Sequence, residues 1–339
     1  METVYIGTYT DGTSEGIYTL NFYPETGQLD SLQLKAALPN PSFLALSEDR
    51  QRLYAVQETA DFDSLGGGVT AFQLNEGVLT TLNSKGTAGA HPCHVALSGE
   101  GQLAVANYTG GNLAVFDLAE DGSLADRQVI QHTATDSTQT PHAHKAHFSS
   151  EGLFVADLGL DEVLRYSLRP YGWIPASQKA LPLPKGAGPR HFVFNTDESF
   201  LYVINELNST ITVFQKDEAG NYSEIQTEST TAVDFEGDSF CADIHLTSDG
   251  KFLYGSNRGE NTIVIFSVDA TSGKISLVGR ESVRGDWPRN FVVSPNEEHL
   301  LVANQRSNNI TIFRRNSETG VLEYTNQFAL EAPVCLVFY

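Results

Sequence analysis

A segment of about 50 residues recurs along the chain, and this repeat limits the possible folds more than any other feature. In most copies a proline precedes a short apolar stretch, and an alanine takes the proline position in the fifth copy. The anchor residues are Pro41, Pro92, Pro141, Pro189, Ala242, Pro288 and Pro333. Because they are spaced about 45 to 53 residues apart, we interpret the chain as copies of one supersecondary unit.

Each copy has the pattern of four short strands. The anchor and its apolar stretch are followed by a polar turn such as Thr196-Asp197-Glu198, then by a second strand, residues 201–204 in the same copy. A third strand, here residues 210–214, ends in an aromatic residue. A turn containing glycine, which supplies positive φ, leads to a more polar fourth strand. Four antiparallel strands in a repeat of this length are typical of a β-propeller blade.

The two ends of the chain complete one copy between them. The last copy stops after its first strand, residues 333–338, while residues 4–9 and 16–20 match a second and a third strand. Pairing of the C-terminal with the N-terminal strand would close the ring and leave no long open edge. The sequence therefore predicts an all-β, seven-bladed β-propeller with four antiparallel strands per blade, formed by residues 1–339 as a single domain.

Composition excludes several classes of partner. The chain has 42 acidic and 21 basic residues and a formal net charge of -21, which argues against binding nucleic acid or an anionic membrane. Its three cysteines have no CxxC spacing, so neither a disulfide framework nor a structural zinc site is expected. No basic leader and no apolar run of about 20 residues is present, so we expect a cytoplasmic protein. The sequence carries no signal for an oligomeric state.

The repeat also predicts where function lies. In an antiparallel blade, the start of the first strand, the end of the second strand and the loop after it share one rim. The longest connections, residues 58–67, 131–140 and 231–239, fall on this rim, where variable loops over a rigid scaffold commonly bind ligands. The first positions after the anchors should surround the mouth of the central channel. They are Ser42, Cys93, His142, Arg190, Asp243, Arg289 and Val334.

Three arginines are expected to converge in one sector of this rim. Arg190 and Arg289 follow their anchors, and Arg258 ends a second strand. Because a guanidinium group offers a planar fork of donors to carboxylate or phosphate, the sequence predicts a site for a small anion. Four further residues of this rim complete the predicted substrate-binding set: Asn205, Asn257, Asp243 and His191, the last expected on the opposite side of its strand from Arg190.

The run Pro141-His142-Ala143-His144 has two chemical readings. Alternate histidines on a strand could bind a metal, but neighbouring arginines would oppose a bound cation, so no metal is expected. A general base, or a hydrogen-bond donor to substrate, suits His142 or His144 better, and both could also simply satisfy backbone groups. Glu206 is either the base or the partner of an arginine. No nucleophile elbow, P-loop or dinucleotide fingerprint is present, so no cofactor is expected.

Several of these segments together resemble the motifs of a known family. They are Val4-Tyr5-Ile6-Gly7-Thr8-Tyr9, His91-Pro92-Cys93-His94, Pro141-His142-Ala143-His144, residues 186–191, residues 203–209 and residues 241–245. Over essentially its whole length the chain is similar to the seven-bladed propeller lactonases, which include propeller-type 6-phosphogluconolactonases and the fungal carboxy-muconate lactonizing enzyme.

The resemblance implies a carboxylic ester hydrolase that converts 6-phospho-D-glucono-1,5-lactone to 6-phosphogluconate in the pentose phosphate pathway, without metal or organic cofactor. The family's catalytic set would correspond to His142 or His144, Arg190, Arg258 and Glu206. Two alternatives stay open. One is a lactonase or cycloisomerase that acts on another sugar lactone or a muconate. The other is a non-catalytic interaction module, because fold alone does not decide function.

Overall fold

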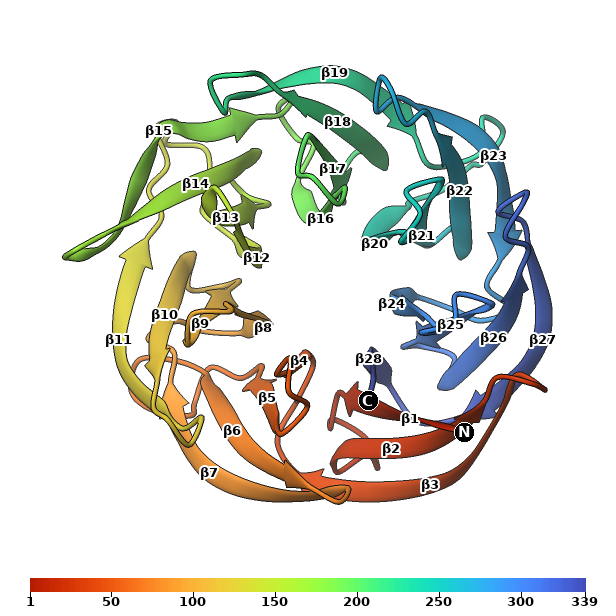
Figure 1. Ribbon diagram of the computed structural model, residues 1–339, viewed down its shortest axis with the longest axis horizontal. Coiled ribbons are helices and arrows are strands. Elements are labelled where there is room, and N and C mark those ends of the chain that lie inside the picture. The colour runs from red at the N-terminus through yellow and green to blue at the C-terminus, as the bar shows by residue number, and fades with distance from the viewer. The chain divides into compact units, whose positions relative to one another are not determined.

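The computed structural model describes all 339 residues, Met1–Tyr339, and contains 28 β-strands and no helix. The strands form seven sheets of four antiparallel strands each (Figure 1). The predicted seven-bladed β-propeller is thereby confirmed. The chain packs as two compact units, which we call the C-terminal unit (Met1–Val4, Leu20–Ser31 and Leu183–Phe338) and the N-terminal unit (Tyr5–Thr19, Leu32–Pro182 and Tyr339).

The N-terminal unit contains three complete sheets. Their strands are β4 (Leu44–Leu46), β5 (Arg52–Gln57), β6 (Gly68–Asn75) and β7 (Val78–Gly86); β8 (Pro92–Leu97), β9 (Gln102–Asn107), β10 (Asn112–Leu118) and β11 (Leu124–Gln131); β12 (Ala143–Ser149), β13 (Gly152–Asp157), β14 (Glu162–Arg169) and β15 (Gly172–Pro182).

The C-terminal unit also contains three complete sheets. Their strands are β16 (Pro189–Phe194), β17 (Phe200–Asn205), β18 (Thr210–Lys216) and β19 (Tyr222–Ser229); β20 (Phe240–Leu246), β21 (Phe252–Arg258), β22 (Thr262–Val268) and β23 (Ile275–Ser282); β24 (Pro288–Val293), β25 (His299–Asn304), β26 (Asn309–Arg315) and β27 (Leu322–Ala329).

The seventh sheet joins the two ends of the chain. Its strands run in the order β28 (Pro333–Phe338), β1 (Glu2–Thr8), β2 (Gly16–Tyr23) and β3 (Gln28–Ala37), so the last strand lies beside the first. The predicted pairing of the terminal strands is present.

The apolar core lies between the faces of successive sheets. β17 is buried at all six positions, whereas the fourth strand of the same sheet, β19, is largely exposed. Tyr202 and Ile204 of β17 pack with Ile244, Leu253 and Val264 of the following sheet. A strand covered on both faces needs an apolar residue at every position, which explains the continuous hydrophobic runs of the second strands in the sequence.

A tyrosine-to-glycine hydrogen bond links several neighbouring sheets. The Tyr202 hydroxyl donates to the Gly273 carbonyl at 3.1 Å, and the Tyr254 hydroxyl donates to the Gly320 carbonyl at 2.8 Å. Each glycine has a positive φ, and a Cβ atom on Gly320 would lie 2.4 Å from Phe252 Cδ1. The hairpin glycines are therefore required both by their turns and by close packing on the preceding sheet.

The first strands of several sheets, β8, β12, β16 and β24, have a β-bulge near their start. This bulge changes the direction of the side chain at that end of the strand. Pro189 pairs with Asn205 and His191 with Ile204, so Arg190 is the extra residue. Cys93, His144 and Arg289 are bulged in the same way. A bulge redirects a side chain and commonly occurs beside active sites.

The strand pairing corrects two predicted anchors. Ala143, not Pro141, pairs with Asp157, and Cys241, not Ala242, pairs with Asn257. His142 therefore precedes the anchor, and His144 occupies the position equivalent to Arg190. The prolines alone could not reveal this, because hydrogen-bond register and not proline placement defines equivalent positions.

Candidate anion-binding site

Glu206 holds two buried arginines together in the C-terminal unit. Its Oε2 lies 3.0 Å from Arg190 Nε and 2.8 Å from Arg258 Nη2, and the two arginine side chains are only 3% and 5% exposed. Arg190 is the bulged residue of β16, Glu206 directly follows β17, and Arg258 ends β21. The structure thus brings Arg190, Glu206 and Arg258 into contact, and we call these three residues the arginine cluster. Of the three arginines that were predicted to converge, Arg190 and Arg258 meet at this carboxylate.

Backbone carbonyls fix the orientation of both guanidinium groups. Arg190 Nη1 donates to the Ala242 carbonyl at 2.5 Å. Arg258 Nε donates to the Phe240 carbonyl at 3.2 Å, and Arg258 Nη2 donates to the Cys241 carbonyl at 2.9 Å. The start of β20 thus supports two cations that come from two other strands, and little freedom is left to either side chain.

The arginine cluster has a net positive charge, because two guanidinium groups share one carboxylate. Burial lowers the pKa of Arg258 to about 10; the charge of Glu206 opposes this shift, while Arg190 and Arg289 add to it. Arg258 stays protonated at neutral pH. Arg289, the bulged and half-buried residue of β24, is therefore close enough to act on the cluster. An anion would relieve this repulsion.

Asp243 is the centre of a second polar network, in which it contacts three strands. Its Oδ1 accepts from His191 Nδ1 at 2.7 Å, and its Oδ2 lies 3.1 Å from His245 Nε2 and 2.5 Å from Asn290 Nδ2. Burial alone would raise the pKa of Asp243, but His245 and His191 hold it well below its usual range. Both carboxylate oxygens are engaged by the protein, and direct substrate binding by Asp243 or His191 stays a prediction.

The two predicted asparagines tie strand ends to their loops. Asn205 Nδ2 donates to the hydroxyl groups of Thr210 and Thr212 at 2.9 and 3.0 Å. Asn257 Nδ2 donates to Thr230 O at 3.1 Å and lies 2.9 Å from Glu260 Oε2. Both asparagines are fully buried and immediately precede Glu206 and Arg258 in the chain. They position the backbone beneath the arginine cluster, and their predicted substrate contacts stay predictions.

In the N-terminal unit, the surroundings of His142 fix the tautomer of its neutral ring. Its Nδ1 lies 3.0 Å from the Tyr108 carbonyl, which can only accept, so Nδ1 carries the proton and Nε2 the lone pair of the neutral ring. The ring stacks on Tyr108 with centroids 4.5 Å apart. The backbone N–H of His142 donates to Asp157 Oδ1 at 2.8 Å. His144 is buried, only 4% exposed.

Two residues near the arginine cluster were missed by the sequence reasoning. The Arg258 Cζ atom lies 5.2 Å from the centroid of the Trp287 ring, and the Arg306 Cζ atom lies 3.4 Å from it. Trp287 directly precedes the anchor Pro288, the same position that His142 occupies in its own copy once the register is corrected. The chain has only two tryptophans, and the presence of one directly before an anchor could have pointed to this residue from the sequence.

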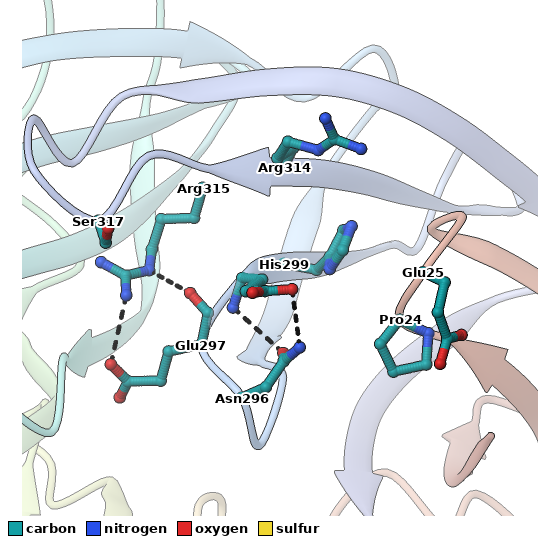
Figure 2. A pocket seen from close by; sticks show the side chains of 9 residues that line it. Pro24, Glu25, Asn296, Glu297, His299, Arg314, Arg315 and Ser317 are labelled. Atoms are coloured by element: carbon teal, nitrogen blue, oxygen red, sulfur yellow. Dashed lines mark hydrogen bonds and ion pairs between the residues drawn. The ribbon is translucent and has the colours of Figure 1, made fainter.

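A separate hollow of about 510 Å³ lies at the opposite, tight-turn end of β25 (Figure 2). Pro24, Glu25, Glu297, His299 and Arg315 are among its lining residues. Arg315 is neutralised there, since its Nη2 lies 3.3 Å from Glu297 Oε2. The hollow contains no residue of the arginine cluster, and no group of three or more His, Cys, Asp or Glu side chains in the structure could hold a metal ion.

A β-propeller that buries two arginines around one carboxylate, where first strands begin and second strands end, has the features of a protein with a binding site for a small anion. Comparison of sequences gives the family. The chain belongs to the lactonases with a seven-bladed β-propeller, whose family model matches residues 3–338.

Relatives cover the whole chain. A 6-phosphogluconolactonase of Bacillus subtilis is 38% identical over 345 residues, covering 98% of this chain and 97% of the relative. A 6-phosphogluconolactonase of Formosa agariphila is 36% identical, with 94% of each chain covered. The periplasmic gluconolactonase of Pseudomonas aeruginosa has a similar structure, with a TM-score of 0.94, 33% identity and coverage of 99% of this chain and 98% of the other.

Proposed function

We propose that this protein hydrolyses 6-phospho-D-glucono-1,5-lactone to 6-phosphogluconate, the lactone-opening step of the pentose phosphate pathway. The observation that carries the proposal is the buried arginine cluster, in which Glu206 neutralises only one of the two charges of Arg190 and Arg258. The relatives from Bacillus subtilis and Formosa agariphila, both 6-phosphogluconolactonases by name, support this substrate.

The chemistry follows from the charges. Water attacks the lactone carbonyl carbon, and the carbonyl oxygen becomes an oxyanion that Arg190 and Arg258 stabilise. Collapse of this intermediate breaks the bond to the ring oxygen, which takes up a proton and becomes a hydroxyl group. The carboxyl group formed in this way then releases its remaining proton to solvent and becomes a carboxylate. Because the guanidinium groups are buried and fixed before substrate arrives, they need no rearrangement as the oxyanion forms.

A general base takes the proton from the attacking water and returns it to the ring oxygen. The sequence left His142, His144 and Glu206 as candidates for this role. The Tyr108 carbonyl keeps Nδ1 of His142 protonated, so Nε2 of that ring is able to accept a proton. Glu206 is assigned the second role that the sequence left open, that of an arginine partner. Its Oε2 contacts both arginines, and the carboxylate thereby orients them.

Replacement of Arg190 tests the proposal. Arg190→Ala should lower kcat by about two to three orders of magnitude, the usual loss when an oxyanion donor is removed. The assay follows acid release from the freshly prepared phospholactone, corrected for spontaneous opening. Arg284→Ala is the matched control, because Arg284 is an exposed cation of the same unit that pairs with Glu281 at 3.3 Å. Undiminished turnover by Arg190→Ala with an intact fold would refute the proposed role.

The choice of lactone has a test of its own. Glucono-1,5-lactone is the second candidate substrate, favoured by the Pseudomonas aeruginosa relative, a gluconolactonase by name. Inhibition of turnover by 6-phosphogluconate, with little effect of gluconate, is expected for the phosphorylated substrate. Equal inhibition by both acids would favour the unphosphorylated sugar, and the absence of turnover with any lactone would favour a non-catalytic interaction module.

We also propose that the protein works in the cytoplasm. Its three cysteines, Cys93, Cys241 and Cys335, are all buried and form no disulfide, as is usual in a reducing compartment. The structure contains no helix with the length and apolar character needed to cross a bilayer.

A further inference from the structure

Trp287 has a backbone conformation that a bulky residue adopts only under strong constraint. Its φ is 66°, in the left-handed region, where a large side chain is costly. Asn40, His91, Gly188 and Ala332, which precede other anchors, have a positive φ as well, and Trp287 has the largest side chain among them. This copy therefore places an indole ring where a glycine would adopt the conformation freely.

A set of hydrogen bonds holds Trp287 in place. Its N–H donates to Asn261 Oδ1 at 2.9 Å, and its carbonyl accepts from the Gln305 N–H at 3.1 Å. Asn261 Nδ2 in turn donates to Asp286 Oδ1 at 2.9 Å. The Asp286 N–H donates to the Ser307 hydroxyl at 2.7 Å. These hydrogen bonds order the loop before β24 and fix the indole ring against the loop after β25.

The indole ring contacts two arginines, one buried and one exposed. Arg258 belongs to the buried arginine cluster, while Arg306 is exposed. The Cζ atom of Arg306 lies 3.4 Å from the ring centroid, a close cation–π contact, and no carboxylate pairs with this guanidinium group. Arg306 is therefore held in position by Trp287 while its charge remains available to a ligand.

The proposed substrate carries negative charge at two places, the reacting carbonyl oxygen and the phosphate group, and the cations of the site fall into two groups as well. The carbonyl oxygen develops a single negative charge in the reaction, and the arginine cluster offers one net positive charge. A phosphate monoester carries close to two negative charges at pH 7. These need further cations beside the cluster, and the structure offers Arg289 of β24 and Arg306 on the loop after β25.

We propose that Arg306, fixed by stacking on Trp287, recognises the phosphate group of the lactone together with Arg289 and makes the enzyme selective for phosphorylated substrates. The inference rests on the proposed function and names the specificity-determining residues of the same site. Trp287 contributes by ordering the long arginine side chain before binding, which lowers the entropy cost of the contact.

The decisive measurement is the ratio of kcat/KM for 6-phosphoglucono-1,5-lactone to kcat/KM for glucono-1,5-lactone. Arg306→Ala should lower this ratio by about tenfold or more, the value of one charge-assisted hydrogen bond. Arg284→Ala removes the same charge from a nearby surface loop and should leave the ratio as in the wild type. An unchanged ratio in Arg306→Ala would overturn the inference.

Replacing Trp287 tests what the indole ring contributes to selectivity while Arg306 is kept. Trp287→Gly suits the left-handed backbone, so the variant should fold, but it frees Arg306 and should lower the same ratio. Trp287→Phe keeps an aromatic face and should retain most of the selectivity. A Trp287→Gly variant with wild-type selectivity would show that the stacking is unimportant to recognition.

Calorimetric binding distinguishes failure of the inference from failure of the proposed function. Wild-type protein should bind 6-phosphogluconate more tightly than gluconate, and Arg306→Ala should lose most of this difference. If the protein hydrolyses neither lactone, the proposed function fails, yet loss of phosphate-dependent binding in Arg306→Ala would still support phosphate recognition. If both lactones are hydrolysed and Arg306→Ala changes neither binding nor the ratio, the inference fails and the lactonase activity stands.

Discussion

Glu206 shares one carboxylate oxygen between two guanidinium groups, and this sharing limits what it can do. Oε2 of Glu206 lies within 3.0 Å of both Arg190 and Arg258, so this oxygen is not available to take a proton from water. Buried ion pairs of this kind add little to stability when complete, but loss of one partner leaves uncompensated buried charge. At the scale of single residues, the carboxylate is therefore what allows two arginines to occupy one site.

Glu206→Gln distinguishes the two roles. If the carboxylate neutralises the arginines, the variant should lose about 2 to 3 kcal/mol of unfolding free energy, because two cations remain buried together. Denaturant unfolding measures this loss. Glu281→Gln is the control, since its carboxylate pairs with an exposed arginine and the change should be well below about 1 kcal/mol. Wild-type stability combined with abolished turnover would instead identify Glu206 as the base.

At the scale of elements, the sequence predicts strands well and register less well. Alternation, turn residues and repeat length were sufficient for seven sheets of four strands, because each strand's burial leaves a pattern in its own residues. The bulges leave no such pattern. Pro141 therefore seemed to be an anchor until its pairing showed Ala143 in that place. Trp287 and Arg306 were missed for a related reason, since their meeting depends on a left-handed backbone and on two separate loops.

The first residue of β25 differs from the first residue of the second strand in the two preceding sheets. Phe200 and Phe252 begin β17 and β21, but β25 begins with His299, which lines the hollow in Figure 2. His299 is only 2% exposed, and both of its ring nitrogens are buried without a hydrogen-bond partner. Burial lowers the pKa of His299 from its usual value of 6.5, Arg314 adds to the lowering, and Glu298 opposes it.

This histidine should make stability depend on pH. In the unfolded chain His299 takes up a proton near its ordinary pKa of about 6.5, whereas the folded protein resists protonation. Its contribution to stability is therefore present above about pH 6.5 and is lost as the pH falls toward the lowered folded pKa. His299→Phe, which introduces the residue that begins β17 and β21, should lose less stability than the wild type between pH 7 and pH 5, as measured by urea unfolding. Parallel pH profiles for the two proteins would contradict this.

At the scale of the whole molecule, charge is distributed unevenly. The formal net charge is -21, yet the arginine cluster, Arg289 and Arg306 collect positive charge in the C-terminal unit. At physiological ionic strength the screening length is about 8 Å, so the many distant carboxylates repel a small anion only weakly. An acidic protein can therefore bind an anionic substrate through a local group of cations.

Carboxylates in the tight turns make the stability of the protein depend on pH in a second, more acidic range. In five turns an aspartate accepts hydrogen bonds from residues of its own turn, and these bonds lower its pKa: Asp49, Asp121, Asp197, Asp217 and Asp269. The stability they contribute is complete above the unfolded aspartate pKa of about 3.9 and is lost as the pH falls through the lower folded values. Asp243, with a pKa held well below its usual range, acts in the same direction.

We therefore expect the melting temperature to fall steeply as the pH is lowered from about 4 toward 2, in a window separate from that of His299. Differential scanning calorimetry across this range measures it. Asp121→Asn keeps a hydrogen-bond acceptor in its turn but removes one titrating group, so its melting temperature should fall less. A melting temperature that stays constant down to pH 2.5 would contradict the assignment.

The pairing of β28 with β1 has a consequence for synthesis. β1 is synthesised long before its neighbour β28, with more than 320 residues between Thr8 and Pro333. The seventh sheet must therefore wait until β28 has been synthesised, and until then β1 has an unfilled edge that could pair with another chain. The slowest step of folding should be this final closure, which depends on the most distant contact in the sequence.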